Sequence, residues 1–179
     1  ISKIEPELIL QPNKIQTFTT TATLESDISL LSINPHMHLL GKTFWAFAIK
    51  PNGDTIPLIK IPNWNFLWQY YYTFPHPVII TKGTTIKVIG TFDNTSKNPN
   101  NPNKPPQLVS QGEGVKSMKT TEEMFQFIFT YLPELFYIIL KPCHQLTTKQ
   151  SDKYVTICRI DSLFEIENVL ATISIKAHH

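Results

Sequence analysis

Two histidines separated by one residue are the first feature of this sequence that could perform chemistry. They occur in the tripeptide His36-Met37-His38. If this segment is a β-strand, alternate side chains share a face and their Cα atoms lie about 6.6–6.8 Å apart. Both imidazoles could then reach one metal ion while Met37 points to the other side. Two such histidines are more often surface or interstrand residues, so the pair alone does not make a metal site.

A methionine further along the chain could complete such a site. Met124 stands in residues 120–127 (TTEEMFQF), at the start of a strongly apolar segment. Core packing is the plain explanation, because Met commonly fills irregular gaps between apolar side chains. If Met124 instead faces the two histidines, the set becomes two imidazoles and one thioether. That set selects copper, especially Cu(I), over zinc, magnesium or calcium, although spacing alone does not show that the three residues meet.

Strands rather than helices must position these residues. Short segments rich in Ile, Thr, Val and Phe, bounded by turn residues, predict strands, whereas helical spacing of apolar residues is hard to find. The predicted strands are 15–24, 28–33, 43–50, 85–92, 123–132, 135–141, 154–160 and 168–176. Glycines within 51–54 and 81–84 predict two hairpin turns. We therefore expect an all-β fold, an antiparallel, jelly-roll-like β-sandwich of about eight to ten strands, in a single domain covering residues 1–179.

One segment departs from the strand pattern. Residues 94–106 (NTSKNPNNPNKPP) contain too many Asn and Pro residues for a strand or a helix. They predict a long loop that is exposed and variable in conformation, since its amides and carbonyls cannot join a ladder. Asn94-Thr95-Ser96 matches a glycosylation acceptor, a pattern that is common by chance.

Composition excludes several classes of function. The 179 residues can bury a core without help from a metal or a disulfide. The 16 basic and 14 acidic residues are spread along the chain, which argues against nucleic acid or an anionic membrane surface as a partner. No apolar run approaches 18 residues, so we expect no membrane span.

The polar residues and the chain start suggest an exported protein. Only 17% of the residues are charged, and the sequence has no initiator Met and no leader segment. We therefore expect a mature form or an excised domain from a periplasmic or extracellular protein. Cys143 and Cys158 could then form one disulfide, and two buried free thiols are the alternative.

Several blocks of the sequence, in a fixed order, resemble one enzyme family. They are PHMHLLGK at 35–42, NFLWQ at 65–69, KGT at 82–84, FDNT at 92–95, GE at 112–113 and TTEEM at 120–124. Together they resemble the C-terminal domain of the copper type II, ascorbate-dependent monooxygenases, a family that includes peptidylglycine α-hydroxylating monooxygenase and dopamine β-monooxygenase. The resemblance is strongest over 15–132, with 133–179 as an extension, and it looks closest to the bacterial branch.

This resemblance implies a copper site and an activity. By matching position, His36, His38 and Met124 would bind one copper ion per chain, at which dioxygen is activated and a C–H bond is hydroxylated. The acidic pair before the methionine reads Asp-Glu in the family and Glu122-Glu123 here. This change should not disturb the copper.

Departures from the family pattern bear on the substrate and the electron source. Asn34 stands where the peptidylglycine enzymes place a substrate-binding Arg, and Gln126 and Ile128 replace an Asn and a Tyr near the substrate. We therefore expect a neutral or apolar small substrate. The second copper domain of the family is absent, and His76, His144, His178 and His179 do not recreate it. An external donor, which could be a haem or copper domain or ascorbate, would have to supply electrons.

Two other functions stay open at this point. The chain could be a non-catalytic copper-binding or copper-carrier module of an exported protein. It could also be a sandwich with an unused site and a role in interaction. The intact set of three candidate ligands makes the last reading the least favoured.

Overall fold

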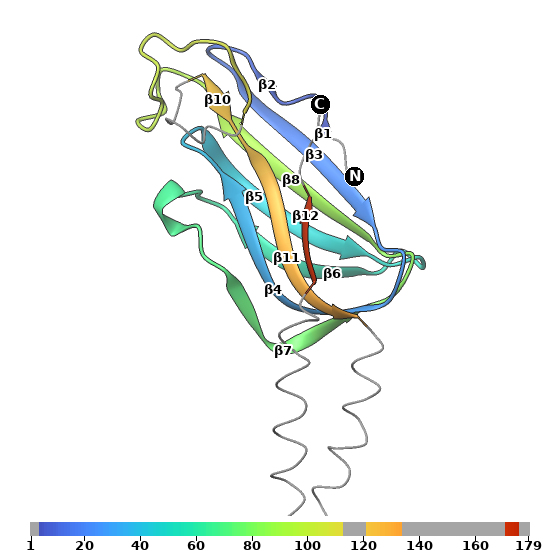
Figure 1. Ribbon diagram of the computed structural model, residues 1–179. Helices are drawn as coiled ribbons and strands as arrows, with labels where there is room; N and C mark the ends of the chain where they lie inside the picture. Colours follow the sequence, from blue (N-terminus) through green and yellow to red (C-terminus); the bar gives the residue numbers. More distant parts are fainter. Residues whose placement is uncertain (1–3, 113–120, 134–170, 176–179) are drawn as a thin grey trace, which may run out of the picture.

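The computed structural model describes residues 4–112, 121–133 and 171–175, most of which form two β-sheets packed face to face (Figure 1). The strands are β1 (Ile4–Glu5), β2 (Ile9–Leu10), β3 (Ile15–Thr23), β4 (Ile28–Met37), β5 (Gly41–Ile49), β6 (Thr55–Ile61), β7 (Tyr72–Ile80), β8 (Thr85–Asp93), β9 (Val109–Gln111), β10 (Glu122–Glu123), β11 (Phe125–Pro133) and β12 (Ala171–Ile175). One 3₁₀ turn, η1 (Phe66–Trp68), is the only helical element among the described residues. The predicted all-β sandwich is confirmed.

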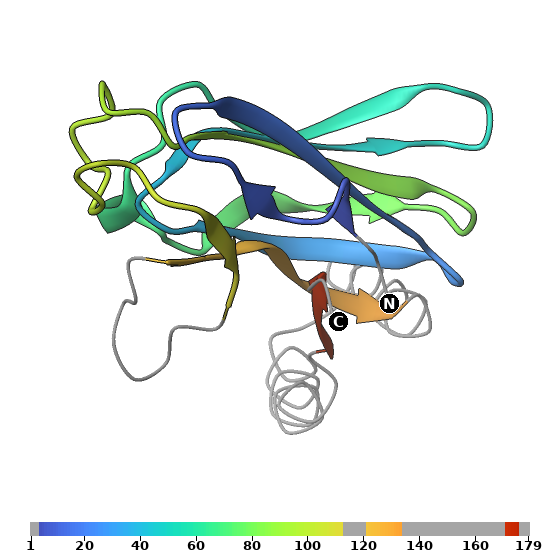
Figure 2. The same ribbon diagram turned by 90° about the horizontal axis from the view of Figure 1, so that it is seen from above.

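The two main sheets are antiparallel and form two layers (Figure 2). One has five strands in the order β1-β3-β8-β5-β6, and the other has four in the order β12-β11-β4-β7. A small sheet, β10-β9-β2, lies at one end and contains a parallel pair, β9 with β10. The adjacent strands β4 and β11 carry the residues of interest, although they are far apart in the sequence.

Phenylalanines fill the space between the two layers. On β8 every second residue is buried, the alternation expected of a strand with one face on a core. Phe125 of β11 reaches across and meets Phe44 and Phe92 of the opposite sheet edge-to-face, with ring centroids 5.7 and 5.8 Å apart. Edge-to-face pairs at this distance are favourable beyond the area they bury.

Gly90 on β8 makes room for Phe125. A Cβ atom at this position would lie 2.6 Å from the Phe125 ring, closer than side chains pack. Because Gly90 has no side chain, the Phe125 ring of the opposite sheet can pack directly against the backbone of β8.

The two predicted turns have different outcomes. Residues 51–54 link the antiparallel strands β5 and β6, and Gly53 has a φ of 91°, so this hairpin is confirmed. Gly83 also has a positive φ, 80°, but its turn joins β7 to β8, which belong to different sheets. The second predicted hairpin is wrong, because a tight turn can also carry the chain from one layer to the other.

The Asn-rich segment is a loop without strands, as predicted, but it is not exposed throughout. Asn94, Asn98, Asn101 and Asn103 are buried. The Nδ2 atom of Asn94 lies within hydrogen-bond distance of three backbone carbonyls, those of Leu10, Gln11 and Gln107.

Side-chain amides replace ladder hydrogen bonds in this loop. The Nδ2 group of Asn101 donates to Oδ1 of Asn94 at 3.0 Å, and that of Asn98 donates to the carbonyl of Asp93 at 2.7 Å. The sequence argument counted only backbone partners and so overlooked that Asn can supply its own donors and acceptors. Asn94 is fully buried and its amide nitrogen is engaged, so it is not accessible to glycosylation in the folded chain.

The C-terminal expectations fall mostly outside the described residues. Cys143, Cys158 and the predicted strands 135–141 and 154–160 lie there, whereas β12 falls within the predicted strand 168–176. No helix in the described part of the chain is long and apolar enough to cross a membrane.

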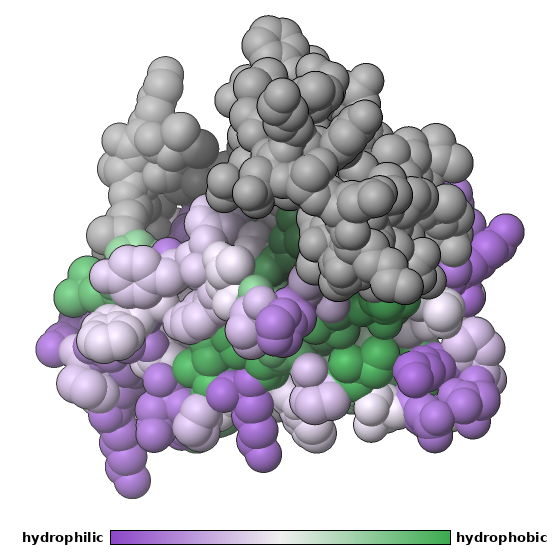
Figure 3. Space-filling model, turned by 90° about the horizontal axis from the view of Figure 1, so that it is seen from below, coloured by the Kyte–Doolittle hydropathy of each residue, from purple (hydrophilic) through white to green (hydrophobic). Residues whose placement is uncertain are grey.

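Seen from below, at the end opposite the last residues of β4, the described surface shows a band of apolar side chains (Figure 3).

Substituting Gly90 should destabilise the sandwich. We expect Gly90→Ala to lower the free energy of unfolding by about 1–3 kcal/mol, because the new methyl group overpacks against Phe125. Urea denaturation measures this loss. Combining it with Phe125→Leu should cost less than the sum of the two single changes, since the smaller side chain relieves the clash. Strictly additive losses would show that the two residues do not compete for space.

Candidate metal centre

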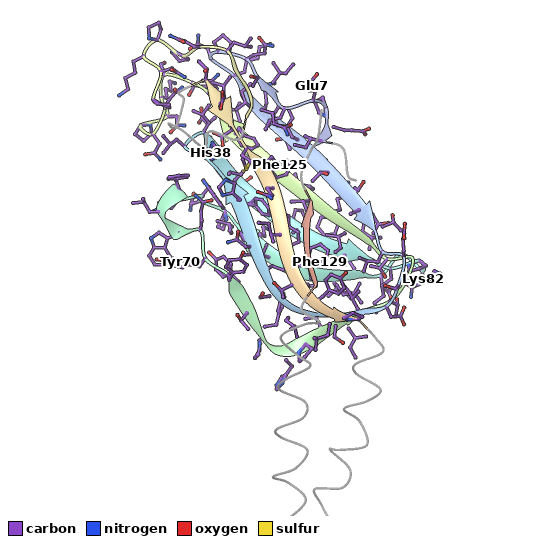
Figure 4. The ribbon with its side chains drawn as sticks, viewed as in Figure 1. Glu7, His38, Tyr70, Lys82, Phe125 and Phe129 are labelled. Atoms are coloured by element: carbon purple, nitrogen blue, oxygen red, sulfur yellow. The ribbon has the colours of Figure 1, made fainter. Side chains whose placement is uncertain are left out.

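The paired histidines stand at the end of β4, on its outer face. Met37, between them, is completely buried in the core, so the alternation of the strand directs both imidazoles the other way. Their ring centroids are 5.1 Å apart and the ring planes are nearly perpendicular, at 88°. Figure 4 shows His38 at this end of the sheet.

The pairing of β4 with β11 brings Met124 to the same place. In this antiparallel ladder Phe125 is opposite Met37 and Gln126 is opposite His36. Continuing the register by one residue places Met124 opposite His38. Directly opposite residues share a face of the sheet, and Phe125 and Met37 both point into the core. Met124 therefore belongs to the face that carries the histidines.

The donor set fits a soft, small metal ion. A ring centroid lies about 3 Å from a metal bound through one ring nitrogen, because metal–nitrogen bonds are about 2.0–2.1 Å long. Two rings with centroids 5.1 Å apart can therefore share one ion. In the described part of the chain, no three His, Cys, Asp or Glu side chains gather to hold a metal. Among the described residues the register offers a third ligand of another type, the thioether of Met124.

The environment of His38 favours the neutral imidazole that a metal needs. Burial lowers the pKa of His38 below its usual 6.5, while the carbonyl and the charge of Glu122 act in the opposite direction. The Nδ1 atom lies 3.5 Å from the Glu122 carbonyl oxygen. A proton held on Nδ1 by that carbonyl leaves the lone pair of Nε2 for a metal ion.

A buried carboxylate joins the two segments that carry the candidate ligands. Glu123 is 1% exposed, and its oxygens accept backbone N–H groups of His38, of Leu40 at 3.1 Å and of Met124 at 3.2 Å. Trp64 also fixes this segment, because its indole N–H donates a hydrogen bond to the carbonyl of His38 at 3.1 Å. The backbone on both sides of the centre is thereby fixed.

Two effects act on the proton of Glu123 in opposite directions. Burial raises the pKa of Glu123 to about 8, whereas the three backbone N–H groups that it accepts lower it. Burial is the larger effect, because a charged carboxylate far from water loses its hydration.

The three residues predicted to shape a substrate pocket lie on the same face. Gln126 is opposite His36, and Ile128 is opposite Asn34. Asn34 and Gln126 are largely buried, at 8% and 6% exposed. The Nδ2 group of Asn34 donates to the carbonyl of Tyr70 at 3.0 Å, so it holds the loop that follows η1.

Sequence reasoning did not assign that loop to the centre. Phe66 of η1 meets the His38 ring edge-to-face, with centroids 6.1 Å apart. The sequence signal for this loop is the uncharged, aromatic run 70–74 (YYYTF), which follows directly after the block at 65–69.

Neither a scan of protein-family models nor a search of curated proteins gave a match to this chain. The assignment to a family therefore remains a proposal, which rests on the quoted sequence blocks and on the chemistry of the face just described.

Replacing Glu123 should loosen this end of the sandwich. We expect Glu123→Gln to reduce the free energy of unfolding by about 1–3 kcal/mol, because the amide NH₂ cannot accept a hydrogen bond and leaves a buried donor unsatisfied. Chemical denaturation compares it with Glu122→Gln, a neighbour that is only half-buried and should cost less. Equal losses in the two variants would argue against a special role for Glu123.

The stability of the metal-free protein should depend on pH through Glu123. Its folded pKa of about 8 lies above the ordinary 4.5, so between these values the folded state binds a proton that the unfolded state has lost. The contribution is fully present below the lower value and is lost as pH rises through the higher one. The lowered pKa of His38 makes stability change with pH in the opposite direction over the same range, so the test is the difference between two proteins: from about pH 5 to about pH 8 the wild type should lose more stability, or gain less, than Glu123→Gln. An unchanged pH dependence would exclude Glu123 as its source.

Proposed function

We infer that this chain is the copper-binding, oxygen-activating domain of a copper-dependent monooxygenase that resembles the copper type II, ascorbate-dependent family. The single observation that carries the proposal is the β4–β11 register, which supports a common face for His36, His38 and Met124. Two imidazoles and a thioether form a ligand set suited to copper in its reduced state.

The residues of the chain have distinct roles in this proposal. His36, His38 and Met124 hold the ion, and Glu123 fixes the backbone of the last two through its hydrogen bonds. Bound copper supplies the one-electron chemistry by which one oxygen atom of dioxygen enters a C–H bond and the other leaves as water. A copper ion held by these three side chains would have room for dioxygen, by analogy with catalytic zinc.

The chain favours a neutral or apolar small substrate. Asn34, Gln126 and Ile128 line the same face and none of them carries a charge. A carboxylate brought next to them would lose hydration without gaining a cationic partner from these three side chains. The peptide carboxylate bound by the peptidylglycine enzymes is therefore disfavoured.

Electrons must reach this centre from elsewhere. Hydroxylation by dioxygen consumes two electrons, and a single copper ion stores one. We propose that a haem or copper domain delivers them, with ascorbate as a reductant of that domain, and that the chain works in the periplasm or outside the cell.

The role of Met124 can be separated from packing. We expect Met124→Ile to fold normally, because volume is nearly conserved, and to bind Cu(I) at least about tenfold more weakly, since the soft ligand is lost. Competition titration with a Cu(I) chelator measures the affinity. Met37→Ile is the matched control, because Met37 points into the core and its replacement should leave Cu(I) binding intact. Unchanged affinity in Met124→Ile would make Met124 a packing residue.

The catalytic proposal predicts a dependence on an electron donor. Loaded with copper and given ascorbate and dioxygen, the isolated chain should show no sustained hydroxylation of glycine-extended peptides. Addition of a donor domain encoded beside it should start hydroxylation of small neutral or apolar substrates. Oxygen uptake and product analysis measure both.

Two results would change this conclusion. Sustained peptide hydroxylation by the chain alone would contradict both the substrate class and the need for a donor. Copper binding without any turnover, even with the neighbouring donor, would favour the copper-carrier function, which requires the same ligands but no chemistry.

A further inference from the structure

Exposed apolar side chains are concentrated in one short segment of the described chain. Of the nine large apolar side chains that are exposed there, five lie within residues 67–72. We call them the aromatic platform: Leu67, Trp68, Tyr70, Tyr71 and Tyr72. Single exposed apolar residues are ordinary on protein surfaces, whereas a cluster of this kind marks a binding surface.

Hydrogen bonds within the segment hold the platform in shape. Asn65 caps η1 by accepting from the N–H of Leu67 at 3.0 Å, and Gln69 donates to the carbonyl of Phe66 at 2.8 Å. The hydroxyl of Tyr72 donates to the carbonyl of Trp68 at 3.2 Å. A surface that is ordered before binding loses little conformational entropy when a ligand arrives.

The platform borders the candidate metal centre. The Asn34 amide donates to the carbonyl of Tyr70, and Phe66, directly before the platform, contacts the His38 ring. Figure 4 shows Tyr70 at the outer side of the molecule, beyond β4, which ends one residue before His38. The Trp68 and Tyr70 rings lie edge-to-face with centroids 6.2 Å apart.

The chemistry of the platform defines the ligand. Residues 61–81 contain no Asp, Glu, Lys or Arg, so the segment has no acidic, Lys or Arg side chain to pair with an ionic ligand. Four of the five platform side chains are aromatic, and Trp and Tyr combine a flat apolar ring with a hydrogen-bonding group. Sugar rings have the complementary form, with apolar C–H faces and hydroxyl edges. We propose that the aromatic platform binds a neutral polysaccharide.

Other ligands fit these observations less well. An anionic membrane would need Lys or Arg beside the apolar residues, and none occurs in the segment. A neutral bilayer also attracts Trp and Tyr at its interface, but the platform has only one aliphatic side chain, Leu67, to enter the acyl layer, and the vesicle arm of the experiment separates the two ligands. The proposal concerns binding alone and does not require a metal, so it goes beyond the proposed function and can fail independently of it.

The experiment uses the metal-free full chain. Binding to insoluble cellulose, chitin and xylan is measured by depletion from solution, alongside neutral phosphatidylcholine vesicles. We expect retention by at least one polysaccharide, and a loss of affinity of about tenfold or more when Trp68→Ala and Tyr70→Ala are combined, because the face of one ring and the edge of the other are both removed from the surface. Trp68→Ala and Tyr71→Ala alone should each weaken binding, and circular dichroism confirms that each variant is folded.

Trp45→Ala is the matched control. Trp45 is also an exposed tryptophan, at 42%, but it lies on β5 of the five-stranded sheet, with Lys60 over its ring. Its loss should leave polysaccharide binding unchanged. The proposal is overturned if no neutral polysaccharide retains the chain, if the folded platform variants bind as well as the wild type, or if the vesicles are bound in place of the polysaccharides.

Discussion

The buried carboxyl group of Glu123 is the contact on which the geometry of the candidate centre depends. It accepts backbone N–H groups from His38 and Leu40 at the end of β4, and from Met124 at the start of β11. Because these donors are buried, losing their acceptor would be costly, and the two chain segments are therefore held at one fixed offset.

That offset matters because side chains alternate along a strand. A slip of one residue in the β4–β11 ladder would turn Met124 away from the histidines and expose Phe125. The core opposes such a slip, since Phe125 fits between Phe44 and Phe92 over the space left by Gly90. Core packing and the position of the candidate ligands are thus two consequences of the same register.

Polar contacts, more than apolar ones, order the loops at this end of the sandwich. Asn94 connects the loop after β8 to the carbonyls at β2, and Lys42 pairs with Asp93 at 3.1 Å. Asn34 fixes the loop that carries the aromatic platform. Loops that are held by side-chain amides can remain near the surface without a strand partner, which suits a binding surface beside a rigid centre.

The sequence by itself determined the all-β class, most strand positions and the residue types at the centre. Alternating apolar residues on β8 and the pattern His36-Met37-His38 are local features, and local features report which side of a strand a residue faces. Only the tertiary structure decided that β11 pairs with β4, because that pairing joins residues some ninety positions apart and depends on packing between layers. The burial of the asparagines and the exposure of the aromatic platform also depend on the tertiary structure. The sequence does not show which backbone groups will lie near an amide, or which aromatic rings will be left outside the core.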